Sequence, residues 1–158
     1  MKKILVLFFA VMLIAVSHVK AQNSSANSST YKNAIGLKFY PTGVTFKHFL
    51  TDDKKAIEFI GYFFNSGNRV TFLYEIHGNI NGIEGLKYYI GPGAHVAFYN
   101  SKYGGATTFG VDGVIGLDYK INSAPINLSV DFQPSLEFGK SYNNGFQGWG
   151  GIAIRYTF

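Results

Sequence analysis

The sequence contains no cysteine. A disulfide framework, zinc bound by cysteine, a thiol nucleophile and a lipid-modified amino-terminal cysteine are therefore excluded. Charge is sparse as well, because Asp, Glu, Lys and Arg make up only 15% of the 158 residues. The basic residues form no stripe of the kind that binds nucleic acid, so we expect no nucleic-acid partner.

Recognisable catalytic motifs are also missing. There is no Gly-x-Ser-x-Gly elbow, no His-Glu-x-x-His and no phosphate-binding loop. We therefore predict no catalytic residue, no metal and no cofactor. His77 and His95, with Glu75 near them, leave a metal or acid–base site as an alternative, and the simpler interpretation is a histidine that is hydrogen-bonded inside the protein.

The amino-terminal segment has the pattern of a secretory signal peptide. Two lysines precede an apolar run at residues 4–16, and Val19 and Ala21 supply a small-residue cleavage pattern, so we predict cleavage after residues 1–21. A transmembrane helix is the alternative, but the apolar run is too short to span a bilayer. Cleavage would lower the formal net charge from +5 to +2. Residues 22–32, rich in serine and asparagine, predict a flexible lead-in.

The remaining chain, residues 33–158, alternates between apolar and polar side chains in segments separated by turn residues. Such alternation predicts strands with one apolar and one polar face. Several segments are longer than usual soluble strands and suit a tilted bilayer crossing. We therefore predict an all-β protein, an eight-stranded antiparallel up-and-down transmembrane β-barrel. The eight predicted strands are residues 34–40, 44–50, 56–64, 69–77, 86–99, 108–120, 126–138 and 146–158.

The side-chain volumes indicate which face points inward. The apolar face carries many large and aromatic residues, which would overfill the interior of an eight-stranded barrel. The polar face carries small residues, which suit a narrow lumen: Gly36, Gly91, Gly93, Gly110, Gly116, Gly151 and Ala153. The apolar face is therefore predicted to contact lipid. A lipocalin-like barrel with an apolar interior and a β-sandwich are the soluble alternatives.

The charged residues lie on the same face as these glycines. We predict that they form a paired lumen network, because buried charges persist only when they are paired. The network comprises Lys38, Glu58, Glu75, Lys87, Asp112, Asp118, Asp131, Glu137 and Arg155, and Lys47 falls on the same face. Arg155 is predicted to pair with Asp131 on the neighbouring strand.

Three positions bear on the alternation of apolar and polar side chains. Pro92, between two glycines, predicts a bulge or kink. His48 falls on the outward face, which predicts that its strand bulges or ends nearby. Trp149 falls on the inner face near one rim.

The chain ends in GGIAIRYTF, with Ile152, Ile154, Tyr156 and Phe158 on one face. This ending resembles the terminal strand of the small eight-stranded outer-membrane β-barrel proteins of Gram-negative bacteria, the OmpX/OmpA-like and "porin family" barrels. The resemblance implies that these four residues are an assembly signal for the barrel-assembly machinery. It also implies a monomer embedded in outer-membrane lipid. The connections here are shorter than those of many OmpX-like barrels, which argues against an adhesive role.

An even number of strands and a cleaved amino terminus place both ends in the periplasm. The sequence thus predicts a non-enzymatic integral protein of the cell outer membrane, structural or porin-like, with a narrow, charged and largely filled lumen. A lipid-modifying barrel enzyme is the alternative, and a soluble lipocalin-like carrier is a third interpretation.

Overall fold

The computed structural model describes residues 31–51, 53–139 and 145–158. The predicted signal peptide and nearly all of the predicted lead-in lie outside these ranges. No helix in the described ranges has the length and apolarity needed to cross a membrane. The elements are β1 (Asn33–Phe39), β2 (Gly43–Thr51), β3 (Lys55–Phe64), β4 (Gly67–Asn79), β5 (Leu86–Tyr99), the 3-10 turn η1 (Ser101–Tyr103), β6 (Thr107–Ile121), β7 (Ile126–Phe138) and β8 (Gly145–Thr157).

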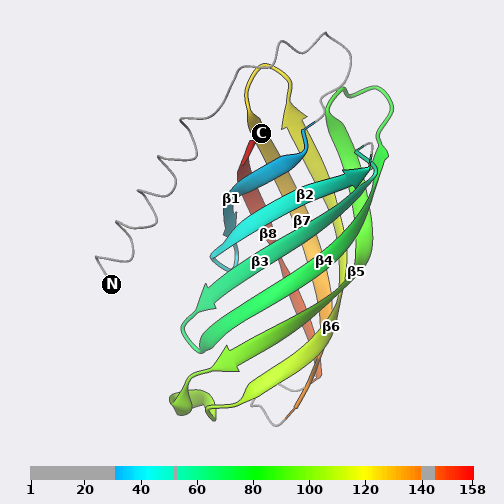
Figure 1. The fold of residues 1–158 in the computed structure, drawn as a ribbon. Coiled ribbons are helices and arrows are strands. Elements are labelled where there is room, and N and C mark those ends of the chain that lie inside the picture. The colour runs from blue at the N-terminus through cyan, green and yellow to red at the C-terminus, as the bar shows by residue number, and fades with distance from the viewer. Residues whose placement is uncertain (1–30, 52, 140–144) are drawn as a thin grey trace, which may run out of the picture.

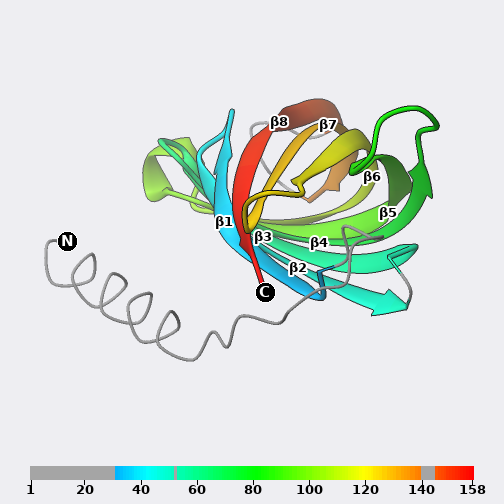
Figure 2. The ribbon, with the colours of Figure 1, turned by 90° about the horizontal axis from the view of Figure 1, so that it is seen from above.

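The eight strands form a closed antiparallel barrel. Each strand pairs with the next in sequence, and β8 pairs with β1, so no strand edge is left open (Figures 1 and 2). This confirms the predicted all-β up-and-down barrel, and every predicted strand is present with bounds that differ by two residues at most. The strands are strongly tilted, as closure of a small barrel requires (Figure 1).

The two faces of the wall have opposite chemistry. Along β4, Arg69, Thr71, Leu73 and Glu75 are fully buried, whereas the alternate residues are exposed or half-exposed on the outside. The other strands follow the same alternation, with mostly polar and small residues inside and large apolar residues outside. A few large apolar residues, among them Phe49, Ile60 and Val114, are buried inside. The lipocalin-like alternative requires an apolar interior and a polar outer face. The structure instead has a mostly polar interior and an apolar outer face.

The two predicted irregularities have different outcomes. The β2–β3 register shifts between Phe49 and Thr51, which confirms the irregularity expected near His48. His48 stays on the outer side, with Nδ1 2.8 Å from Oδ1 of Asn33, and Phe49 turns inward. Of the two alternatives predicted at Pro92, the bulge is wrong, because pairing with β4 is only interrupted there and resumes in the same register. The kink stays a prediction.

The seam between β1 and β8 requires a glycine. A Cβ atom added at Gly36 would lie 1.9 Å from the carbonyl oxygen of Ile154 and 2.6 Å from the Cα of Arg155. We expect Gly36→Ala to lower the free energy of unfolding by about 1–3 kcal/mol, since the seam backbone must separate. Urea unfolding in lipid vesicles measures this change. Gly61→Ala is the control, because its Cβ would meet no atom closer than 3.5 Å. Equal losses in both variants would contradict the prediction.

Candidate functional site: the charged barrel interior

The barrel interior contains most of the charged side chains of the strands. Its buried carboxylates are Glu58, Glu75, Asp112, Asp118, Asp131 and Glu137, and its buried cations are Lys38, Lys47, Arg69 and Arg155. Eight of the nine residues predicted for the lumen network are therefore buried. The ninth, Lys87, is half-buried at one mouth, where its Nζ lies 3.4 Å from a carboxylate oxygen of Asp53.

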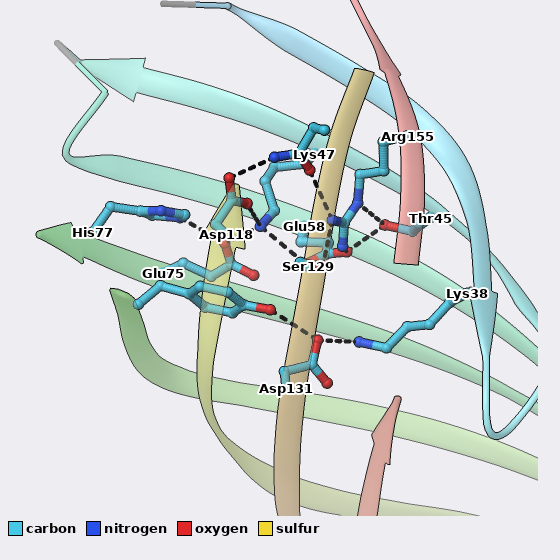
Figure 3. A network of polar contacts seen from close by, with 12 residues as sticks. Lys38, Thr45, Lys47, Glu58, Glu75, His77, Asp118, Ser129, Asp131 and Arg155 are labelled. Carbon is cyan, nitrogen blue, oxygen red and sulfur yellow. Dashed lines mark hydrogen bonds and ion pairs between the residues drawn. The ribbon is translucent and has the colours of Figure 1, made fainter. Parts of the chain in front are cut away.

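Five side chains form what we call the central cluster: Lys47, Glu58, Glu75, Asp118 and Arg155 (Figure 3). Lys47 Nζ lies 2.8 Å from Glu75, 3.2 Å from Asp118 and 3.6 Å from Glu58, measured to carboxylate oxygens. Lys47 is on β2 and Asp118 on β6, which are opposite walls in a ring of eight strands. One ammonium group therefore joins three acids across the lumen.

Arg155 completes the central cluster and corrects a prediction. Its Nη2 pairs with Glu58 on β3, and its Nη1 donates to the side-chain oxygens of Asn127 at 3.1 Å and Ser129 at 2.7 Å. The predicted pair with Asp131 is wrong. The β7–β8 register places Asn127 opposite Arg155, so Asp131 is four residues further along the strand, a separation of about 13 Å.

Asp131 instead binds side chains from β1, β5 and β7. Lys38 on β1 forms an ion pair with it, and the hydroxyl of Tyr89 donates to its Oδ2 at 2.8 Å. The side-chain amide of Gln133 donates to its Oδ1 at 3.0 Å. Tyr62 on β3 in turn donates to Gln133 at 2.9 Å, across the full width of the barrel.

A second group of charges, the outer cluster, lies nearer the end that carries η1. It consists of Arg69, His95, Asp112 and Glu137. Arg69 pairs with Asp112, and the Nδ1 of His95 lies 2.9 Å from the same carboxylate. The Arg69 guanidinium lies 4.5 Å from the ring centre of Trp149, which confirms that this tryptophan faces inward.

Sequence reasoning did not include Arg69 in the network. The signal was available, since alternation from the inward Thr71 places Arg69 on the same face. The position was overlooked because it lies at the first residue of the predicted strand, where alternation is hardest to assign.

The two lumen histidines contact different clusters. His77 Nε2 is 2.8 Å from Glu75, and its ring stacks on Tyr89 with centroids 5.1 Å apart. His95 contacts Asp112 instead. The suggested joint site of His77, His95 and Glu75 is therefore not assembled. Among the residues that the structure describes, no group of three or more His, Asp or Glu side chains is placed to hold a metal ion.

The carboxy-terminal residues form the barrel seam. Ile152, Ile154 and Phe158 are exposed on the outer face, and the half-buried Tyr156 stacks against Phe158 with ring centroids 6.2 Å apart. The backbone groups of Phe158 and Asn33 exchange two hydrogen bonds of 2.9 Å. These positions close β8 onto β1, and the assembly-signal role remains a prediction.

Comparison with known proteins identifies the fold of this chain but assigns it to no family. No family model and no curated protein sequence matches the chain. Among solved structures, the amino-terminal β-barrel domain of Pseudomonas aeruginosa OprF is similar at 21% identity and a TM-score of 0.58, covering 80% of this chain and 94% of that one. Neisserial surface protein A (NspA) is also found, at 14% identity and a TM-score of 0.49, covering 80% of this chain and 93% of that one. This chain therefore has the fold of the small eight-stranded Gram-negative outer-membrane β-barrels.

Proposed function

We propose that this chain is a non-enzymatic integral protein of the cell outer membrane, structural or porin-like, with a lumen filled by its own side chains. The observation that carries the proposal is the inverted distribution of polarity. The charges are buried inside, while the outer face exposes large apolar residues such as Ile90, Ile115 and Phe132 at 52%, 56% and 49%.

Lipid is the solvent that suits this outer face. A soluble monomer rarely exposes a continuous apolar surface of this extent. A closed barrel pairs the backbone N–H and C=O groups of every strand with those of a neighbouring strand, which is what a span through hydrocarbon demands. The OprF domain, which shares the fold, supports this assignment through the fold alone.

Aromatic side chains at both rims fit the two membrane interfaces. At the end that carries η1, the exposed aromatic residues include Phe63, Phe109, Phe138 and Phe146. At the opposite end they are Tyr88, Tyr119 and Phe158. Outer-membrane barrels carry such girdles where the apolar band meets the headgroups.

The packed interior favours a structural over a freely conducting barrel. Lys47 joins opposite walls through Asp118, and Tyr62 joins opposite walls through Gln133. An eight-stranded barrel has an interior only wide enough for side chains to fill. The lumen charges therefore serve to hold the walls together in this proposal.

Cell fractionation tests the proposed location. The protein is expected in the outer membrane, extractable only with detergent, and with gel mobility that changes on heating. Recovery as a soluble periplasmic protein would overturn the proposal. The enzyme alternative is tested by the mass profile of lipid A with and without the gene, and a profile that changes with the gene would favour that alternative.

The terminal phenylalanine offers a specific test of assembly. We expect Phe158→Ala to reduce the fraction of protein that reaches the heat-modifiable membrane form, if the barrel-assembly machinery reads this residue. Phe146→Ala is the matched control, because Phe146 is an exposed phenylalanine at the other end of the same strand. Quantitative gels of outer-membrane fractions compare the two variants. Equal assembly of both would remove the signal role from Phe158.

A further inference from the structure

An apolar layer interrupts the charged interior. Five lumen side chains from β3, β4, β5 and β6 contact one another and are 0–2% exposed: Ile60, Tyr62, Leu73, Tyr89 and Val114. We call this group the apolar layer. A lumen lined only by ion pairs would have no reason to contain such a cluster, because the large apolar residues of these strands otherwise point outward.

The layer lies between the central and the outer clusters. On β4, Leu73 is placed between Arg69 of the outer cluster and Glu75 of the central cluster. On β6, Val114 is placed in the same way between Asp112 and Asp118. Within the described ranges, no ion pair joins a member of one cluster to a member of the other.

The opposite wall closes the cross-section at this level. Tyr62 reaches Gln133 and Tyr89 reaches Asp131, both on β7, and Asp131 pairs at the same level with Lys38 on β1. A Cβ atom at Gly116, the strand partner of Tyr89, would lie 2.6 Å from the tyrosine Cζ, so the ring occupies the space that this glycine leaves. The tyrosine bodies thus fill the lumen between the aliphatic side chains and β7.

We propose that this apolar layer, and not the ion pairs of the central and outer clusters, prevents ions from passing through the barrel. The inference rests on the proposed membrane location. A charged side chain can bind an ion and replace part of its hydration shell. An apolar constriction has no group that binds an ion, and it excludes water. The central and outer clusters are therefore separate polar compartments. The layer between them, bordered by the Lys38–Asp131 pair, is the barrier.

The balance of buried charges determines which ions would pass through the lumen once the apolar layer is opened. The interior holds six buried carboxylates against four buried Lys and Arg side chains. Rings of carboxylates favour cations in channels. Opening the layer is therefore expected to let small monovalent cations pass in preference to anions.

Planar-bilayer recording of the purified, refolded full chain in potassium chloride tests the proposal. Wild-type protein is expected to give no resolved current steps. Ile60→Ser combined with Leu73→Ser is expected to produce steps, and under a salt gradient their zero-current potential should shift toward the potassium equilibrium potential. Gel mobility before and after heating establishes that each variant has folded. Where the serine variant does not fold, Ile60→Ala combined with Leu73→Ala makes the same opening without new polar groups.

Arg69→Met combined with Asp112→Asn is the matched control, because it breaks an ion pair of the outer cluster and leaves the layer intact. This control is expected to stay silent. A folded layer variant without current, or an ion-pair variant that conducts as well as the layer variant, would overturn the proposal. Wild-type protein that conducts as freely as the layer variant would do the same. Fractionation of cells decides the membrane location separately, so failure of the location and failure of the barrier can be told apart.

Discussion

Replacing Lys47 by methionine is expected to lower the free energy of unfolding by about 3–5 kcal/mol, the loss typical of breaking a buried ion pair from one side. The Lys47 ammonium is the one group of the central cluster within 3.6 Å of Glu58, Glu75 and Asp118. Methionine fills a similar volume, so the loss arises from electrostatics and not from a cavity. The buried carboxylates would then lose their shared counter-ion.

Urea unfolding in lipid vesicles at neutral pH measures this loss. Lys55→Met is the matched control, since Lys55 is exposed at the start of β3, and its free energy of unfolding should change by less than about 0.5 kcal/mol. Adding Glu75→Gln to Lys47→Met should recover part of the loss, because one uncompensated carboxylate is removed. A Lys47 variant as stable as the Lys55 variant would show that the central cluster does not hold the walls together.

Replacing Ile115 by arginine is expected to cost about 2–4 kcal/mol of folding free energy in a bilayer, the penalty for a cation at the midplane of a lipid-facing strand. Ile115 lies near the middle of β6 and is 56% exposed on the outer face. The penalty arises because hydrocarbon cannot solvate the guanidinium group. The measurement is again unfolding of the refolded barrel in vesicles.

Comparison of Ile115→Arg with Ile83→Arg tests whether the outer face contacts lipid or water. Ile83 is 52% exposed, nearly the same as Ile115, but lies in the connection between β4 and β5. If the outer face contacts water, both substitutions should change stability by less than about 0.5 kcal/mol. If it contacts lipid, Ile115→Arg alone should be strongly destabilising. Two equally mild variants would refute the membrane assignment.

Alternation in the sequence determined the strands and the two faces of the wall. Successive side chains of a strand point to opposite faces, so residues such as Glu75 and Phe72 could be assigned inside and outside without coordinates. Short connections between the segments determined the neighbours, because consecutive strands joined by tight turns pair with each other. The irregularity near His48 was predictable for the same reason, since a break in the alternation marks a change in register.

The partners of the charges were decided only by the tertiary structure. Lys47 and Asp118 are 71 residues apart, and Tyr62 and Gln133 are also 71 apart, on strands that meet only across the closed lumen. The level of each side chain in that lumen depends on strand tilt and on the stagger at the β1–β8 seam, which no local pattern encodes. Arg155 was assigned the wrong partner because alternation gives the face of a residue but not the β7–β8 register, which places Asn127 opposite Arg155. The apolar layer was not foreseen, because it is assembled from a few residues of several strands only when the barrel closes.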